Sequence, residues 1–361
     1  MDLPRYVPCL RWKQGEYQAA SRLSRQAREA IVPLIEVPEM GFDFETRENC
    51  KTVDEHLAMF SKRMSGNWGS APCMVDLHLL DHGLRMANGD HPLTYVFSRL
   101  RAEGVMAVPV VASSFDRPQL KATKQTVGVD GRGVCVRVGI EEAASHELKR
   151  LIDSLLGESG ASVTACDLVL DLGAPSFEPL DDFASLVEVL IEGFPYLKRW
   201  RSFTLMGTSF PSTLAGVPKG STVLPRHEWR LYRLLLSRPP ISKTRLPAFG
   251  DYGISHPGVI QGDMRLLKPS AAIRYTVTDG WLITKGTNLR APGGHRQFPR
   301  LSQEIARSKH YTGPDFSAGD KRIAECASGM GGPGNLTTWR FVGTNHHLEK
   351  VVRDLATLPG L

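Results

Sequence analysis

Short apolar runs, each ended or interrupted by a polar residue, recur along the first 250 residues of the chain. The first run, residues 6–11, is followed by a polar cluster that includes Lys13 and then by an amphipathic helical pattern at residues 16–30. The second run, residues 31–38, is almost continuously apolar and carries one carboxylate, Glu36, near its end. Runs of this kind are typical of parallel strands that are covered on both faces.

Eight such runs occur, at residues 6–11, 31–38, 73–77, 106–112, 134–138, 166–172, 202–206 and 246–253. Helical patterns follow most of them, at residues 16–30, 53–64, 92–103, 141–156, 181–191 and 226–236. Eight strand–helix units in about 250 residues match a (β/α)₈ barrel in number and in length. A doubly wound open sheet is the alternative, but no GxGxxG motif follows the first run. The pattern therefore predicts an α/β protein with a (β/α)₈, TIM-barrel-like fold.

The C-terminal part of the chain follows a different pattern. Within residues 272–285, β-forming residues flank Asp279-Gly280, a dipeptide that favours a type I′ hairpin turn. The segments beyond it are a helical pattern at 301–309, a glycine-rich stretch at 329–334, and a terminal helix at 348–355 that Thr344-Asn345 would cap. We predict a barrel at residues 1–265 and a C-terminal hairpin-and-helix elaboration, packed on the barrel, at residues 266–361.

Composition excludes several classes of protein. The chain has 361 residues, of which 42% are hydrophobic and 23% charged, as expected of a globular protein. Its apolar runs are broken well before the roughly 20 residues that a membrane span needs, and no signal-peptide pattern is present. A cytoplasmic protein without a membrane partner is the expectation. The cysteines form no CxxC pair, and Cys9, Cys73, Cys135 and Cys166 lie in or beside apolar runs, which predicts buried free thiols.

Charge is distributed unevenly between the two halves of the chain. Residues 1–180 contain 20 Lys and Arg and 24 Asp and Glu, a net charge of −4, whereas residues 181–361 contain 24 and 14, a net charge of +10. A basic half of this kind can attract a nucleotide or a nucleic acid. A solvated basic surface explains the same imbalance.

Candidate site residues follow from the barrel geometry, because the carboxyl ends of the strands face the active-site mouth. The polar residues at or near these ends are Lys13, Glu36, Asp76 or His78, Ser113, Arg137, Asp171, Ser209 and Asp251, with Tyr252 adjacent. Charged side chains inside parallel strands are costly to bury unless they are paired, so their convergence favours a site.

Four interpretations of this cluster are open. The carboxylates of Glu36, Asp76 and Asp171 could bind a hard cation such as Mg²⁺ that polarises a phosphate. Two of them could perform acid–base chemistry on a glycosidic or phosphoester bond. Lys13 could be a desolvated nucleophile or base. In the fourth interpretation, the groups form a buried ion-pair network without chemistry, in which Lys13 and Arg137 balance the carboxylates.

The C-terminal tail contributes further candidate ligand-binding residues: Arg340, Asn345, His346 and His347. Adjacent histidines point in different directions, and neither HxxxH nor HExxH is present, so a zinc site is not favoured. One of the pair is instead expected to donate to a phosphate or a carboxylate, or simply to cap the last helix. Trp339-Arg340 could supply a stacking surface and a cation for a base, although a buried Trp beside a surface Arg is equally common.

Four segments together resemble the phage-type beta protein family: Leu10–Tyr17, Pro33–Glu36, the strand with Asp76, and Gly334–His347. The resemblance spans nearly the whole chain. It implies a context in phages and in bacterial mobile or defence-associated loci, and it supplies no catalytic residues. The resulting hypothesis is a barrel whose charged mouth binds or acts on a phosphate-bearing ligand, closed by residues 340–347. The alternative is a non-catalytic module that docks a protein or nucleic acid through its basic C-terminal half.

Overall fold

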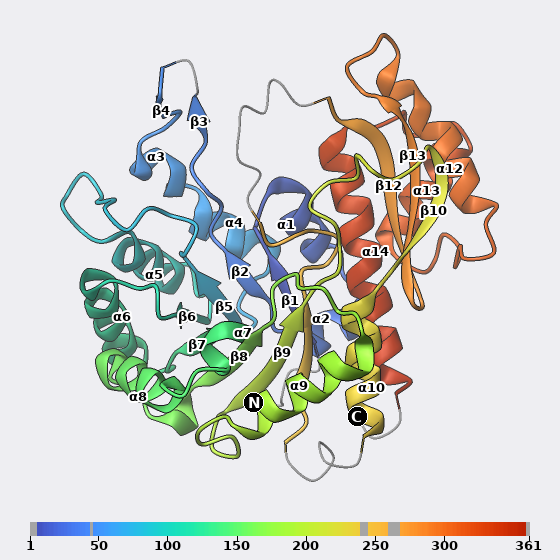
Figure 1. Cartoon of the computed structure of the whole chain (residues 1–361). Helices are drawn as coiled ribbons and strands as arrows, with labels where there is room; N and C mark the ends of the chain where they lie inside the picture. The colour runs from blue at the N-terminus through green and yellow to red at the C-terminus, as the bar shows by residue number, and fades with distance from the viewer. Residues whose placement is uncertain (1–5, 44–45, 239–244, 259–267, 359–361) are drawn as a thin grey trace. The chain divides into compact units, whose positions relative to one another are not determined.

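The computed structural model describes residues 6–43, 46–238, 245–258 and 268–358, and these form two compact units (Figure 1). Unit 1 comprises residues 1–12, 32–207 and 228–251, and unit 2 comprises residues 13–31, 208–227 and 252–361. Each unit therefore combines segments that are far apart in the sequence. The predicted boundary at residue 265 lies outside the described residues.

Unit 1 is a closed barrel of eight parallel strands, which confirms the predicted fold. In chain order the strands are β1 (Tyr6–Leu10), β2 (Leu34–Glu36), β5 (Cys73–Asp76), β6 (Ala107–Val111), β7 (Cys135–Gly139), β8 (Asp167–Asp171), β9 (Ser202–Gly207) and β11 (Ala248–Asp251). They are arranged β1-β11-β9-β8-β7-β6-β5-β2, and β2 pairs with β1 to close the ring. All eight apolar runs became barrel strands because their side chains are buried on both faces, as in β1 and β6.

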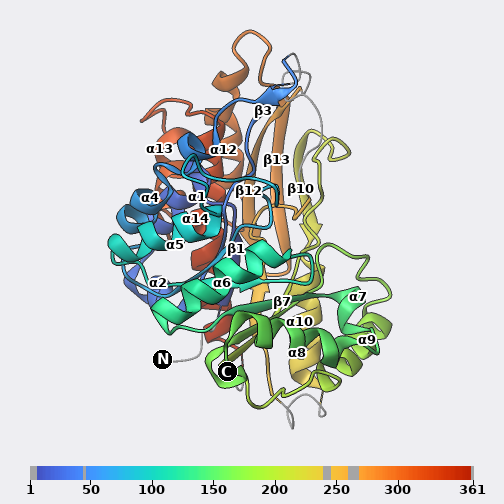
Figure 2. The same ribbon diagram turned by 90° about the vertical axis from the view of Figure 1, so that its left-hand side faces the viewer.

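Helices cover the outside of this barrel. They are α3 (Val53–Leu57), α4 (Phe60–Asn67), α5 (Pro92–Ala102), α6 (Arg117–Asp130), α7 (Ile140–Ala143), α8 (Leu148–Ser159), α9 (Leu180–Glu192) and α10 (His227–Ser237). Helices α4, α5, α6 and α8 pack successively against one another, and α5, α6 and α8 can be followed in Figure 2. Helix α6 was not predicted. Asp116 caps its start by accepting a hydrogen bond from Gln119 N at 2.8 Å, and Gly131 ends it at a φ of 64°. Strands β3 (Phe42–Asp43) and β4 (Glu48–Asn49) pair as a short two-stranded ribbon.

An ion pair stabilises the amino-terminal end of the barrel strands. Asp167, the first residue of β8, binds Arg201 through both carboxylate oxygens, with Nε–Oδ1 and Nη2–Oδ2 distances of 3.0 and 2.5 Å. Ser202 donates to the same carboxylate at 2.6 Å. Two parallel guanidinium hydrogen bonds fix geometry as well as charge, so this end of the barrel is held by a structural contact.

Unit 2 contains an antiparallel sheet in the order β10-β13-β12 and a set of helices. Its elements are α1 (Gln14–Ser21), α2 (Arg25–Ala30), β10 (Gly220–Pro225), β12 (Ser270–Val277), β13 (Gly280–Asn288), α12 (Phe298–Ala306), α13 (Ala318–Ala327) and α14 (Leu336–Ala356). The hairpin at Asp279-Gly280 is confirmed, with Val277 paired to Gly280. Helix α14, red in Figure 1, packs against β12 and against α1, α2 and α13. It is the central element of the unit.

The start of α14 corrects the sequence prediction. Asn335 caps the helix, accepting a hydrogen bond from Thr338 N at 3.0 Å, so the helix begins twelve residues before the predicted Leu348. Thr344-Asn345 lies inside it and caps nothing. Trp339 is buried and stacks on Phe298 with ring centroids 4.6 Å apart, so it belongs to the core and not to an exposed stacking surface.

The expectation for the cysteines was met. All six cysteines are free, and the four that were predicted to be buried are buried. Burial raises the pKa of the Cys73 thiol to about 12, so it stays protonated near neutral pH. Among the described residues, no helix combines the length and apolarity that crossing a bilayer requires.

Candidate functional site

Arg137 is the centre of the charged cluster at the carboxyl end of the barrel strands. From β7, its Nη1 donates to Asp76 Oδ2 at 2.8 Å and to Glu36 Oε1 at 3.1 Å. Its Nε and Nη2 lie 2.8 and 2.7 Å from Asp171 Oδ2. One guanidinium therefore binds three carboxylates that come from three different strands.

The register of the sheet explains this convergence. Glu36 and Asp76 are paired residues at the ends of the adjacent strands β2 and β5. Asp171 ends β8, the neighbour of β7 on its other side. Strands β2 and β7 are separated by β5 and β6 in the ring, so the Arg137 side chain spans the barrel interior to reach Glu36. The carboxylates of Glu36 and Asp76 are 2% and 1% exposed, which makes this neutralisation essential for their burial.

His78 lies at the more accessible side of the same cluster. Its side chain is 30% exposed, its Nδ1 lies 3.1 Å from Asp76 Oδ2, and its Nε2 lies 3.6 Å from Glu36 Oε1. Burial opposes the charge of the imidazole, but the contact with Asp76 and the charge of Glu36 outweigh it and raise the pKa of His78 above its ordinary value. Conversely, burial opposes ionisation of Asp76, yet His78 and Arg137 hold the pKa of this carboxyl well below its usual range.

A second cation, Arg11, approaches Glu36 from the end of β1. Its Nε lies 3.5 Å from Glu36 Oε2, and its side chain is 16% exposed. Cys9 lies two residues before Arg11, on β1, and is buried. Burial together with the charge of Glu36 raises the pKa of its thiol. The two most exposed basic side chains of the cluster, His78 and Arg11, therefore lie beside the carboxylates of Glu36 and Asp76, which are 2% and 1% exposed.

This arrangement bears on the metal interpretation of the cluster. The Arg137 guanidinium occupies the position between the carboxylates that a bound Mg²⁺ would take. No group of three or more His, Cys, Asp or Glu side chains within the described ranges is placed to hold a metal ion. The interior of the cluster is thus an ion-pair network. His78 and Arg11, at its edge, have side-chain exposures of 30% and 16%, whereas Arg137 and Asp171 are each 11% exposed.

Two other predicted barrel residues lie in different surroundings. Asp251, at the end of β11, is fully buried and accepts a hydrogen bond from Tyr6 Oη at 2.7 Å. Ser113 is exposed and donates to Glu142.

The remaining predicted residues belong to unit 2. Lys13 is exposed at the start of α1, where its carbonyl oxygen accepts from Glu16 N at 2.9 Å. This exposure removes the desolvation that a lysine nucleophile would need, so that interpretation was wrong. Ser209 donates to Pro225 O and accepts from His227 N at 2.9 Å, a contact that orders the chain before α10. Tyr252 is buried. Closure of the mouth by residues 340–347 stays a prediction.

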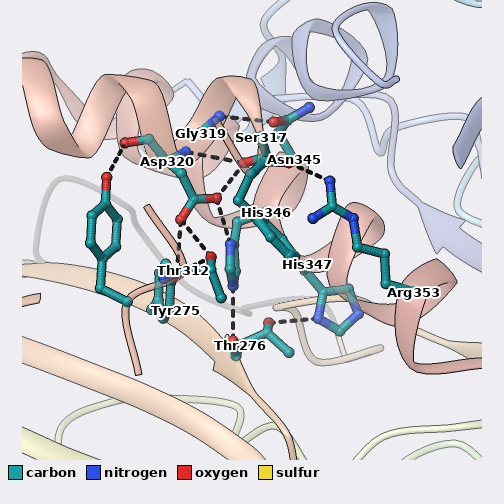
Figure 3. A network of polar contacts seen from close by, with 12 residues as sticks. Tyr275, Thr276, Thr312, Ser317, Gly319, Asp320, Asn345, His346, His347 and Arg353 are labelled. Carbon is teal, nitrogen blue, oxygen red and sulfur yellow. Dashed lines mark hydrogen bonds and ion pairs between the residues drawn. The ribbon is translucent and has the colours of Figure 1, made fainter. Parts of the chain in front are cut away.

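His346 and Asp320 form a fully buried ion pair in unit 2 (Figure 3). His346 Nδ1 lies 2.7 Å from Asp320 Oδ2, and His346 Nε2 lies 2.8 Å from the carbonyl oxygen of Thr276. A carbonyl oxygen only accepts, so Nε2 carries a proton. Burial opposes ionisation of Asp320, but the charge of His346 and hydrogen bonds from Ser317 and Tyr275 lower the pKa of Asp320.

Asn345 and His347 extend this network along α14. Asn345 accepts from Gly319 N at 2.8 Å and donates to Ala19 O at 3.0 Å, which joins the start of α13 to the end of α1. His347 Nδ1 lies 2.8 Å from Thr276 Oγ1. The expectation that one of the two histidines donates to a phosphate or a carboxylate stays a prediction, and His346 Nδ1 lies 2.7 Å from Asp320 Oδ2. Because His346 and Asn345 are buried, their role here is structural.

Comparison with protein families places the chain. The model of the Beta protein family matches residues 6–353. The chain belongs to the Beta protein family. A search of curated proteins found no match. The phage and defence context that the resemblance implied is not addressed by this match and stays an expectation.

Several solved structures are similar to this family member. Triosephosphate isomerase from Bartonella henselae is 12% identical, with 69% of this chain and 92% of that chain covered and a TM-score of 0.35. The YdjI aldolase from Escherichia coli K12 is 11% identical, with 99% and 93% covered and a TM-score of 0.34. A putative fructose-1,6-biphosphate aldolase from Coccidioides immitis is 11% identical, with 99% and 91% covered and a TM-score of 0.38.

Sequence reasoning missed part of the cluster. Arg11 was recognised as polar but was not chosen as a candidate, although it directly follows the first strand. His78 was considered only as an alternative to Asp76, whereas the two form one contact. Both could have been found by including residues one or two positions beyond each strand, since loops after barrel strands build the mouth.

Proposed function

We propose that unit 1 is an enzymatic barrel that binds a phosphate-bearing ligand at the carboxyl end of its strands and moves a proton through His78. The observation that carries this proposal is the position of His78, a partly exposed imidazole held beside two buried carboxylates. An imidazole with a neighbouring carboxylate is a common general acid–base arrangement.

The charge of the accessible groups favours an anionic ligand. The raised pKa of His78 keeps the imidazolium populated closer to neutral pH, and Arg11 adds a permanent charge nearby. A phosphate oxygen that approached the cluster would contact the hydrogen-bond donors of His78 and Arg11 before it came near the carboxylates. Asp76 would then position the ring and stabilise its protonated form, without itself reacting.

Glu36 has spare hydrogen-bonding capacity that a ligand could use. Its Oε2 atom is buried and receives no hydrogen bond, although Arg11 Nε lies 3.5 Å away. A buried carboxylate oxygen without a hydrogen bond lowers the stability of the fold. Such an oxygen is expected at a binding site, where a ligand supplies the missing donor. A ligand hydroxyl or a water carried by the ligand would satisfy it.

The test compares ligand binding and turnover in matched variants. Purified protein is incubated with a panel of nucleotides, sugar phosphates and phosphorylated oligonucleotides, and products are followed by phosphorus NMR at several pH values. His78→Gln should lower turnover by about 10²–10⁴-fold, the range for loss of a general acid–base, and it should also weaken binding, because one of the two cations is lost. Arg11→Gln should mainly weaken binding. Turnover that is unchanged in His78→Gln would overturn the proposed role.

The biological expectation needs a separate assay. We expect cells that express the chain to differ from control cells in phage plaque formation, and His78→Gln to remove that difference. If charge reversals of exposed Lys and Arg at residues 181–361 remove it while His78→Gln does not, the chain acts as a non-catalytic module that docks a protein or a nucleic acid.

A further inference from the structure

Two arginines of unit 2, Arg274 on β12 and Arg340 on α14, have no acidic partner. Within the described parts of the chain, no carboxylate lies within ion-pair distance of either guanidinium. Arg274 Nε is buried and has no hydrogen-bond partner. The guanidinium carbon of Arg274 lies 5.7 Å from the centroid of the Phe210 ring. Charged groups that are removed from water without a counter-ion destabilise a fold, so their presence requires an explanation.

The packing around Gly343 brings the two arginines to the same place. A side chain at Gly343 of α14 would meet the Arg274 carbonyl oxygen at 2.9 Å and Ile254 Cδ1 at 2.7 Å, so β12 and residue 254 both lie against this turn of the helix. Arg340 is three residues earlier and therefore on the same face. Its Nη1 donates to Ile254 O at 3.3 Å and to Ser255 Oγ at 2.7 Å.

The Arg340 side chain is held in place from the other side by α1. A methyl group at Gly15 would lie 2.7 Å from Arg340 Cβ and 2.6 Å from its Cγ, which shows that the helix backbone packs directly on the aliphatic stem. Arg340 thus has little freedom to turn away from Arg274. Burial, reinforced by the charge of Arg340, lowers the pKa of Arg274 to about 9. The two like charges are kept together by the surrounding structure.

We propose that Arg274, Arg340 and the Ser255 hydroxyl form a binding site for a phosphate group, distinct from the barrel cluster around Arg137. Both arginines are only partly buried, so an anion can reach them. A phosphate offers oxygens for two guanidinium groups and a hydroxyl at once and neutralises the repulsion between the arginines. The group could belong to inorganic phosphate, a nucleotide or a nucleic-acid backbone.

The experiment titrates the full chain with inorganic phosphate, a nucleoside monophosphate and a short oligonucleotide at constant ionic strength, by calorimetry and by thermal unfolding. We expect Arg274→Gln and Arg340→Gln each to weaken phosphate binding about tenfold or more. Arg296→Gln, an exposed arginine of the same unit, is the matched control and should bind as the wild type does. The ligand that binds tightest identifies the source of the phosphate group.

Stability without ligand gives a second, independent readout. Removal of one of two repelling charges should leave the melting temperature of Arg274→Met equal to or above that of the wild type in phosphate-free buffer, while the rise caused by phosphate disappears. A purely structural arginine would instead lower the melting temperature equally with and without phosphate, and that result would overturn the proposal. Binding that is lost in His78→Gln but retained in Arg274→Gln would assign the phosphate to the barrel cluster instead.

Discussion

Arg137 Nη1 lies 3.1 Å from Glu36 Oε1 and joins β7 to β2 across the interior of the barrel. The same nitrogen lies 2.8 Å from Asp76 Oδ2, so one atom neutralises two carboxylates that are almost completely buried. The contact links strands that are not neighbours in the sheet. It therefore supports the closed form of the barrel as well as the charge balance of the site.

Replacement of Arg137 should be strongly destabilising. Arg137→Met leaves Glu36, Asp76 and Asp171 without their shared counter-ion, and loss of one partner of a buried ion pair costs roughly 3–5 kcal/mol. Urea unfolding measures this change. The loss should be smaller when Asp171→Asn is added, because one unpaired charge is removed. Arg150→Gln, which affects an exposed pair with Glu147, should change stability little, and a large effect there would indicate that the assay is not specific.

The pH dependence of stability should report His78. Because the pKa of His78 is raised in the folded protein, its stabilising effect is complete below the unfolded value of about 6.5 and is lost as the pH rises through the folded-state pKa. The stability difference between wild type and His78→Gln should therefore be largest near pH 5.5 and shrink towards pH 9. His146→Gln, at an exposed histidine, should give a curve parallel to the wild type. A difference that grows with pH would contradict the assignment.

Asp320→Asn should show how much the buried pair in unit 2 contributes. The asparagine keeps the shape of the side chain but has one acceptor oxygen for the three groups that contact Asp320, namely His346, Ser317 and Tyr275. At least one buried donor then loses its partner, for an expected loss of about 1–3 kcal/mol at pH 7. The pKa of Asp320 is lowered, so its contribution is present above the unfolded value of about 3.9 and is lost as the pH falls through the folded value. Stability measured from pH 7 to pH 3 should fall less steeply in the variant. If stability falls equally steeply from pH 7 to pH 3 in the variant and in the wild type, Asp320 does not cause the loss of stability in acid.

Two glycine-to-alanine substitutions should have opposite effects. A methyl group at Gly319 would collide with the carbonyl oxygen of Val342, where α13 approaches α14, and overpacking of this kind costs about 1–3 kcal/mol. Gly157, in the exposed face of α8, has open space around it, so Gly157→Ala should stabilise the protein by up to about 1 kcal/mol. Thermal unfolding of both variants measures this. If the two substitutions changed the melting temperature equally, α13 and α14 would pack less tightly at Gly319 than the structure shows.

The barrel could be predicted from the sequence because each strand is a separate apolar run, and the strand-end rule then placed Glu36, Asp76, Arg137 and Asp171 together. Helix α6 was missed because Thr123, Thr126 and Val127 have low helix propensity. In the folded protein, tertiary packing of the helix outweighs this low propensity. The same conflict hid the first half of α14, which contains Thr337, Thr338, Phe341 and Val342.

The candidate sites were harder to predict, since they depend on contacts between distant residues. Arg274 alternates with apolar residues along a hairpin strand, a pattern that ordinarily marks a solvent-facing position. Only the approach of α14 brings it under Arg340. Similarly, His346 could be identified as a donor, but its partner Asp320 lies on another helix that the apolar pattern did not reveal.

The division of unit 2 into three chain segments constrains the order in which the protein can assemble during synthesis. The ribosome completes the eighth barrel strand at Asp251 before any part of β12, β13 or α14 exists. Helices α1 and α2, made near the beginning, must wait for a helix that starts at residue 336. A recombinant fragment that began at residue 252 would leave Asn345 without its acceptors Ala19 and Arg22 and would expose the face of α14 that they cover. Addition of two peptides, one that spans residues 13–31 and one that spans residues 208–227, should rescue such a fragment, as in split-protein complementation.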